Sequence, residues 1–386
     1  MSKRVLITIL LAFVFVLALT ACGGATSPTA APQPTVAPAT AAAPTAASTG
    51  KKLKVGVVTD VGGPDDKSFN QTSIAGLNRA IQDGLIDPSS KYLQSRQQTD
   101  YAKNIEEFIS QGYDMVVTIG FLLGVDTANE AKKNPNVKFA IVDYTYPDCA
   151  AGAKEGTDCG SATAIPNVLG LHFNIQEATF QAGYLAAALT KTKKVGTFGG
   201  VNIPPVVDFS VGFEGGIHYY NQKHNDKVQL IGWNTAKNDG VFTGTFTDPD
   251  KGKQSALSLI DEGADIILPV AGSTGNGAFT AAAEKKVYAI GVDTDQCVSI
   301  PDACPVLITS NMKRTDNAVY NAIKSAVDGT FKGGIYTATL ENGGVGLAPY
   351  HNNASMVSSA LQGELDQIKA DIIAGKIDIT SLAKGQ

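Results

Sequence analysis

A short apolar run followed at once by a polar loop carries the clearest chemistry in this 386-residue sequence. Residues 53–58, Leu-Lys-Val-Gly-Val-Val, are typical of a strand buried in a parallel sheet. The loop after them supplies a hydrogen-bond acceptor, Asp60, a flat aromatic ring, Phe69, and an amide, Asn70, close to an expected helix start. Ligands of open α/β sheets bind beyond the carboxyl ends of the strands. These groups are therefore candidates to bind a sugar or a nucleoside.

Two more aspartates follow strand-like runs in the same way. Asp143 and Asp293 each come directly after a mostly apolar segment. A carboxylate at a strand end can accept two charge-assisted hydrogen bonds from adjacent hydroxyl groups, although helix capping is the alternative role for Asp60 and Asp143. Two facing carboxylates need a cation nearby. Lys313 is the candidate, although a lone lysine usually lies on the solvated surface.

A second aromatic wall for a flat ligand is expected from Phe246. This residue follows a turn rich in Gly and Thr and precedes Asp-Pro, so it should lie in a loop. Phe209 is the second candidate, whereas Phe213, at helical spacing from it, is expected in the core. Phe69 itself has an alternative role as the first core residue of the helix that follows it.

The segment Gly-Ser-Thr-Gly-Asn-Gly from Gly272 opens an expected helix and superficially resembles a phosphate-binding loop. It lacks the Lys-Ser/Thr end of such a loop, and its spacing departs from the dinucleotide fingerprint. We expect the backbone N–H of Gly272 or Ser273 to bond a sugar hydroxyl instead. The aspartates at the strand ends would repel a phosphate, which favours an uncharged ligand.

Strand-like and helix-like segments alternate in two series, which indicates βαβ units on two parallel sheets. The expected strands are residues 54–59, 114–118, 137–142, 194–198, 228–233, 264–268 and 287–292, and the expected helices are residues 70–83, 127–133, 176–189, 212–221, 253–262, 276–284, 316–328 and 358–375. Lobe 1 is expected to comprise residues 51–172 and 311–334, and lobe 2 residues 173–310 and 335–386. A ligand cleft is expected between the lobes.

The N-terminus has the features of an exported lipoprotein. Lys3-Arg4 and the apolar run over residues 5–19 predict a signal peptide at residues 1–21. The segment Leu-Thr-Ala-Cys that ends at Cys22 resembles a bacterial lipobox, which implies a lipid on the cysteine; an ordinary signal peptide beside an incidental cysteine is the alternative. Residues 22–50 are rich in Ala, Pro, Thr and Ser, too poor in bulky apolar groups to fold, so we expect a tether.

Charge and cysteine content exclude some classes of partner. The formal charge of −5, without a cluster of Lys and Arg, disfavours nucleic acid. Among three possible pairings, the short separations favour the disulfides Cys149–Cys159 and Cys297–Cys304 in an exported chain. No Cys-x-x-Cys spacing occurs and the four histidines are scattered, so we expect no metal and no cofactor.

The polar loop also carries a family resemblance. Asp60, followed five residues later by Asp-Asp-Lys-Ser-Phe-Asn-Gln, resembles the basic-membrane-protein lipoproteins, which are purine nucleoside receptors of ABC transporters. Further matching segments spread the resemblance over residues 53–350: Gly199-Gly200-Val201-Asn202-Ile203-Pro204-Pro205-Val206, Phe209, Gly212-Phe213, Phe246-Thr247-Asp248-Pro249, Lys253, Ala271-Gly272-Ser273-Thr274-Gly275, Gly291-Val292-Asp293 and Thr309-Ser310-Asn311-Met312-Lys313-Arg314. The resemblance implies a type 1 periplasmic-binding-protein fold, with two Rossmann-like lobes, parallel sheets and a hinged cleft between them. It also implies that Asp60 and Asn70 are candidates to bond the base or its neighbourhood and that Phe69 covers one face of the ring.

We therefore expect a lipid-anchored, monomeric receptor on the extracytoplasmic face of the cell membrane. It would stack a purine nucleoside between Phe69 and Phe246, hold the ribose through Asp143, Asp293 and Lys313, and deliver the ligand to a permease and its ATPase. A sugar or autoinducer-like receptor of the same fold and a sensory ligand-binding module are the alternatives.

A nucleoside-cleaving enzyme is the less favoured alternative. Residues 59–66 resemble the calcium loop of nucleoside hydrolases, but Thr59 and Val61 stand where its first two aspartates belong. No other arrangement of nucleophile, base or paired carboxylates has a distinctive motif, so we expect no catalytic activity.

Overall fold

The computed structural model describes residues 51–385. The signal peptide expected at residues 1–21, the lipidation site Cys22 and the tether that ends at residue 50 lie outside the described residues. Within the described part of the chain, no helix has both the length and the apolar character needed to cross a membrane.

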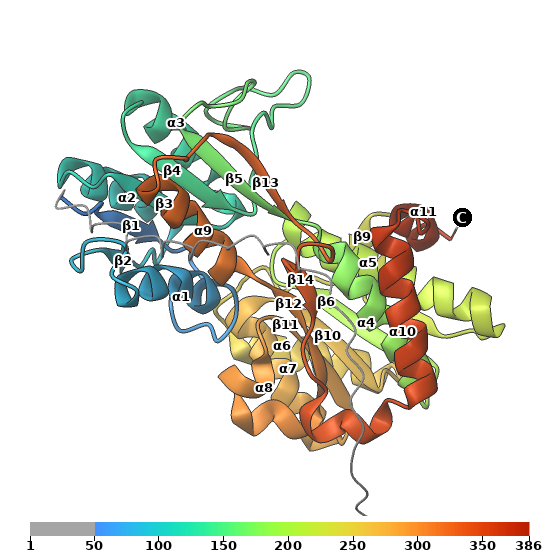
Figure 1. Ribbon diagram of the computed structural model, residues 1–386. Helices are drawn as coiled ribbons and strands as arrows, with labels where there is room; N and C mark the ends of the chain where they lie inside the picture. The colour runs from blue at the N-terminus through green and yellow to red at the C-terminus, as the bar shows by residue number, and fades with distance from the viewer. Residues whose placement is uncertain (1–50, 386) are drawn as a thin grey trace, which may run out of the picture. The chain divides into compact units, whose positions relative to one another are not determined.

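Two six-stranded sheets organise residues 51–385, as the alternating pattern predicts (Figure 1). The first is parallel throughout, in the order β13-β5-β4-β3-β1-β2. Its central strands are buried on both faces, which explains their nearly continuous apolar sequence. Its strands are β1 (Val55–Val58), β2 (Lys91–Leu93), β3 (Met115–Ile119), β4 (Lys138–Val142), β5 (Val168–Phe173) and β13 (Gly334–Ala338).

The second sheet repeats this arrangement. Its order is β14-β12-β11-β10-β6-β7, with β14 antiparallel to β12 and the other strands parallel. In each sheet the first strand along the chain lies inside the sheet and the second lies beside it at one edge. The next three strands follow on the other side of the first strand. The strands are β6 (Lys194–Gly199), β7 (Gln229–Ile231), β10 (Ile266–Val270), β11 (Tyr288–Asp293), β12 (Leu307–Lys313) and β14 (Val345–Leu347), with a separate hairpin of β8 (Trp233–Asn234) and β9 (Asp239–Gly240).

Helices cover both faces of each sheet. We call the first sheet with α1, α9, α2 and α3 lobe 1, and the second sheet with α4, α5, α6 and α7 lobe 2. Lobe 2 also carries α8, between β11 and β12, and α10, which lies alongside α4 (Figure 1). The helices are α1 (Phe69–Gln82), α2 (Tyr101–Ser110), α3 (Gly124–Lys133), α4 (Ile175–Leu189), α5 (Pro204–His224), α6 (Pro249–Asp261), α7 (Gly272–Lys285), α8 (Gln296–Ser299), α9 (Thr315–Val327), α10 (Ser359–Ile373) and α11 (Ile379–Ala383), with 3-10 turns η1 (Gln98–Asp100), η2 (Phe121–Leu123), η3 (Pro301–Val306) and η4 (His351–Met356).

The chain crosses between the lobes after β5, after β12 and after β13. In Figure 1, α9 and β13, drawn in orange and red, lie with the blue and green elements of lobe 1. The strand β12 continues to Lys313 and β13 to Ala338, so both sheets extend slightly beyond the lobe limits expected at residues 310 and 334. The exact limits of the lobes stay a prediction.

Two disulfides hold loops of the described chain. They join Cys149 to Cys159 and Cys297 to Cys304, the local pairs that the spacing favours. The first lies in the long loop between β4 and β5, and the second ties α8 to η3 before β12.

Glycine is required where α4 and α5 pack together. A Cβ on Gly183 would lie 2.0 Å from the carbonyl oxygen of Phe213. We expect Gly183→Ala to lower the free energy of unfolding by about 1–3 kcal/mol, because the two backbones must move apart. The matched control is Gly363→Ala on the exposed face of α10, where an added Cβ meets no described atom within 4 Å. The control should be neutral or stabilise by up to about 1 kcal/mol. Equal losses for the two variants in urea denaturation would contradict this account.

Candidate ligand-binding cleft

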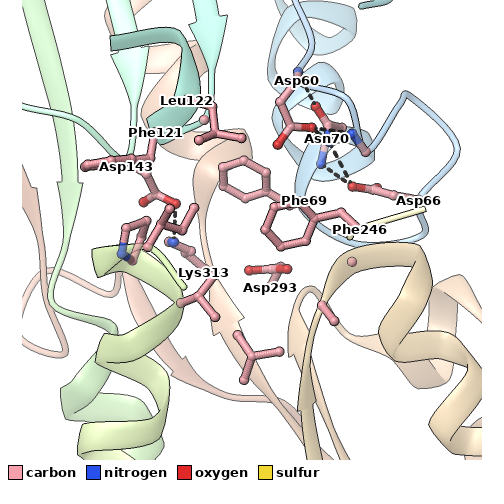
Figure 2. Close-up of a pocket in the computed structure, with 18 of the residues that line it drawn as sticks. Asp60, Asp66, Phe69, Asn70, Phe121, Leu122, Asp143, Phe246, Asp293 and Lys313 are labelled. Carbon is pink, nitrogen blue, oxygen red and sulfur yellow. Dashed lines mark hydrogen bonds and ion pairs between the residues drawn. The ribbon is translucent and has the colours of Figure 1, made fainter. Parts of the chain in front are cut away.

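A cavity lies where the carboxyl ends of the strands of the two lobes approach each other (Figure 2). Its empty space, including the open mouth, is about 580 Å³. Lobe 1 contributes the loops after β1, β3 and β4, and lobe 2 contributes α5, the loop before α6 and the ends of β10, β11 and β12. The lining includes nine residues proposed from the sequence, Asp60, Phe69, Asn70, Asp143, Phe209, Phe246, Gly272, Asp293 and Lys313, but not Ser273, the alternative to Gly272. Their contacts with a ligand stay predictions.

Asp60 is held by its own loop. Its Oδ1 accepts hydrogen bonds from the Asn70 side-chain amide at 2.7 Å and from the Gly62 N–H at 2.8 Å. Burial raises the pKa of the Asp60 carboxyl to about 7, against the opposing effect of these hydrogen bonds. Within residues 51–385 no group donates a hydrogen bond to Oδ2, so this oxygen is available to a ligand.

Asn70 lines the cavity, but its polar atoms are occupied within lobe 1. Its Nδ2 donates to Asp60 and, at 3.1 Å, to Asp66, while its Oδ1 accepts the N–H of Asp60 at 3.2 Å. In this state Asn70 orients Asp60, and its bond to the base or its neighbourhood, which the resemblance implies, stays a prediction.

Asp66 is a cavity-lining residue that was not among the candidates from the sequence. Its two oxygens accept the backbone N–H groups of Ser68, Asn70 and Gln71 at 2.8–3.1 Å, which anchors the start of α1 and the ring of Phe69. Burial raises the pKa of the Asp66 carboxyl. An aspartate shortly before a predicted helix start was the available signal, because such residues often accept the first free N–H groups.

Lys313 is buried, although lysine side chains usually lie on the solvated surface. Its Nζ lies 2.6 Å from Oδ2 of Asp143, and the two side chains are only 2% and 7% exposed. The rings of Phe69, Phe173 and Phe209 have their centroids 5.3–5.4 Å from the same nitrogen. The ammonium group is therefore stabilised by one carboxylate and three aromatic faces.

Asp143 and Asp293 take equivalent places in the two lobes. They come at the ends of β4 and β11, and both have left-handed backbone conformations, with φ of 65° and 66°. Asp293 accepts a hydrogen bond from the hydroxyl of Ser68 in the opposite lobe. Burial raises the pKa of the Asp293 carboxyl to about 6, although Lys313 and Ser68 act in the other direction.

The aromatic residues divide into cavity-lining residues and a core residue, as their positions in the sequence suggest. Figure 2 shows the rings of Phe69 and Phe246, from opposite lobes, pointing into the same cavity. Phe209 also lines the cavity from α5, whereas Phe213 is fully buried in the core. Gly272 begins α7 with φ of +53°, a conformation that favours glycine.

The cavity also has an apolar wall that the sequence reasoning missed. Its members share no polar motif and come from η2, α5 with the residue before it, and the end of β10. They are Phe121, Leu122, Ile203, Pro205, Val206, Val270 and Ala271. No local signal distinguishes them from core residues, because only the approach of the two lobes places them at a cleft.

The sequence is similar to known substrate-binding proteins of ABC transporters. The sequence matches the family model described as "ABC transporter substrate-binding protein PnrA-like" over residues 53–383. The ABC transporter nucleoside-binding protein BmpA of Lactococcus lactis is 32% identical over 347 residues, which cover 85% of this chain and 89% of BmpA. The CD4+ T-cell-stimulating antigen of Listeria monocytogenes is 31% identical over 346 residues, covering 85% of this chain and 88% of the antigen.

A solved structure supports the fold assignment. The solute-binding protein of an ABC transporter system from Aeropyrum pernix K1 is 27% identical, with a TM-score of 0.71 over 84% of this chain and 92% of that one. Two sheet-based lobes of the type 1 periplasmic-binding-protein kind are thus confirmed. The chain belongs to the Bmp family of PnrA-like substrate-binding proteins of ABC transporters.

Proposed function

We propose that this protein is a lipid-anchored receptor that closes its two lobes on a purine nucleoside and delivers it to the permease of an ABC importer. One observation carries the proposal: phenyl rings from both lobes, Phe69 and Phe246, line the same cavity as buried carboxylates and a buried ammonium group. Aromatic rings suit a flat heterocycle, and carboxylates suit the hydroxyl groups of a pentose.

The polar groups divide between the two parts of the ligand. Oδ2 of Asp60 accepts an N–H group of the base, while Asp143 and Asp293 accept hydroxyl groups of the ribose. Lys313, which already pairs with Asp143, donates to the same sugar. A nucleotide is disfavoured, because its phosphate would enter a cavity lined by four aspartates and one lysine.

The relative BmpA of Lactococcus lactis, named as a nucleoside-binding protein, supports this class of ligand. Transport requires a separate permease and ATPase, and this chain performs no covalent chemistry in the proposal. The chain acts as a monomer, held at the extracytoplasmic face by a lipid on Cys22.

The lipid anchor predicts the mass of the intact protein. We expect this mass to include a diacylglyceryl group on Cys22. An unmodified cysteine in membrane-extracted protein would overturn the anchor.

Replacing either phenyl ring by an aliphatic side chain should weaken binding of the nucleoside. We expect Phe69→Leu and Phe246→Leu each to lower inosine affinity by about 5- to 150-fold, since stacking of a base on an aromatic ring contributes about 1–3 kcal/mol. Isothermal titration calorimetry measures the loss. Tyr92→Leu, on the exposed strand β2, is the control and should bind as the parent does. Parent-like affinity in both cavity variants would contradict the stacking arrangement.

Native mass spectrometry of the purified protein tests the ligand class directly. We expect a co-purified purine nucleoside, displaced by added inosine, guanosine or adenosine and not by free ribose. Displacement by a free sugar alone would favour the sugar receptor, and release of free base from inosine would favour the enzyme. Either result would overturn the proposal.

A further inference from the structure

Hydrogen bonds outside the cavity join the lobes directly. Nδ2 of Asn276 on α7 donates to the carbonyl oxygen of Asp66 at 3.0 Å. The hydroxyl of Ser299, at the end of α8, donates to the carbonyl oxygen of Lys67 at 2.8 Å. Nε2 of Gln296 lies 3.4 Å from that same carbonyl and 3.1 Å from Oδ1 of Asn276. Three side chains of lobe 2 thus converge on two consecutive carbonyl groups of lobe 1.

The accepting segment also carries the aromatic wall of the cavity. Lys67 has a left-handed backbone conformation, with φ of 58°, and two residues later Phe69 turns its ring into the cleft. The lining of the cavity includes Phe69 but none of the three donating side chains. Any contact that holds these carbonyl groups therefore also holds the ligand-facing loop against lobe 2.

Gln296 is fixed in place within lobe 2. Oε1 of Gln296 accepts the N–H of Val292 at 2.9 Å, and the N–H of Gln296 donates to the hydroxyl of Ser310 at 3.1 Å. The side chain is almost fully buried. The disulfide that joins Cys297 to η3 restrains the same short segment. Rigid donors lose little conformational entropy when they meet an acceptor, so they suit a contact that forms on closure.

We propose that Asn276, Gln296 and Ser299 are positioning residues that hold the closed form and thereby set how long a ligand stays bound. Solute affinity in a hinged protein depends on the fraction of molecules that can reach the closed form. These three residues raise that fraction through contacts with protein alone. Their effect is thus independent of which solute the cavity takes, whereas Phe69 and Phe246 act on the ligand itself.

The test uses two substitutions in the full chain. Asn276→Asp keeps the side-chain shape and an acceptor for Gln296, but it turns a carboxylate oxygen towards the carbonyl of Asp66. Ser299→Ala removes a single hydroxyl group. Ser325→Ala is the matched control, because that hydroxyl donates to the carbonyl of Ala322 within α9 of lobe 1. Thermal unfolding should be similar in the three variants.

Two readouts separate this proposal from the identity of the ligand. Spin labels on non-natural amino acids at the exposed positions Glu106 and Asp250, one in each lobe and both outside the contact, report the interlobe distance without ligand. We expect longer distances in Asn276→Asp and Ser299→Ala, and parent distances in the control. With inosine, whose use rests on the proposed function, we expect dissociation about 3- to 10-fold faster for Ser299→Ala and at least as fast for Asn276→Asp.

Unchanged distances in both variants would overturn the proposal. If the parent protein does not bind inosine, the nucleoside assignment fails, and the distances alone then decide whether the contacts hold the closed form. If inosine binds and the distances lengthen but dissociation keeps the parent rate, the proposed effect on residence time is overturned.

Discussion

Lys313→Met is expected to lower the free energy of unfolding by about 3–5 kcal/mol, the usual effect of leaving one partner of a buried ion pair uncompensated. The substitution removes the ammonium group that lies 2.6 Å from Asp143, whose side chain is only 7% exposed. Methionine retains much of the apolar stem that packs among the surrounding rings, so the loss reports charge more than volume. Urea denaturation at pH 7.5 without ligand measures it.

A double variant tests the cause. Lys313→Met combined with Asp143→Asn removes both charges, so it should recover a large part of the lost stability. Inosine binding should still be lost in the double variant, because the proposed ribose contacts are gone. If the two substitutions destabilise additively, with no recovery, the pair does not act as a unit and the electrostatic account is wrong.

Asp60→Asn is expected to raise the free energy of unfolding at pH 8 by roughly 2–4 kcal/mol, since each pKa unit between the folded and unfolded states corresponds to about 1.4 kcal/mol. The Asp60 carboxyl is buried, and its pKa in the folded state is raised from 3.8 to about 7. Because the folded value lies above the unfolded one, its contribution to stability is fully present below about pH 4 and is lost as the pH rises to about 7. Asparagine keeps the acceptor for Asn70 and has no charge to bury.

The pH profile distinguishes this effect from a general change in packing. Urea denaturation from pH 4 to pH 8 should show the gain of Asp60→Asn growing with pH and vanishing near pH 4. In the variant, the free energy of unfolding should still depend partly on pH, because burial also raises the pKa of Asp293, to about 6. Asp87→Asn is a control whose effect on stability should have the opposite sign, because hydrogen bonds from Ser89 lower the pKa of the Asp87 carboxyl. A gain that is equal at all pH values would contradict burial of the charge as the cause.

The expected gain of Asp60→Asn means that a carboxylate of the site lowers the stability of its own scaffold. Buried carboxylates such as Asp60 and Asp293 are unfavourable in the ligand-free protein, and hydrogen-bond donors on a ligand would compensate them. Asp60→Asn should therefore gain stability and lose affinity together, the common consequence of optimising a binding site for fold stability.

Local sequence was sufficient for most of the long elements, but the helix α2 and the strands β5 and β12 were not among those expected. The apolar runs that became β1, β3 and β4 are buried on both faces, so their pattern is nearly continuous. The short strands β2 and β14 were not expected, because three-residue strands at a sheet edge carry little periodicity. The helix α5 begins at Pro204, well before the expected start at residue 212. Its two consecutive prolines are a normal helix start that the sequence reasoning did not use.

The sequence by itself determined the two-lobed α/β fold and the strand ends at which Asp60, Asp143 and Asp293 stand, because both depend on local patterns of apolar and polar residues. Only the tertiary structure decided which groups meet. Lys313 pairs with Asp143 across 170 residues of chain, and Asn276 reaches the carbonyl of Asp66 across 210. Such contacts follow from how the two lobes approach each other, and no spacing within either lobe specifies that approach.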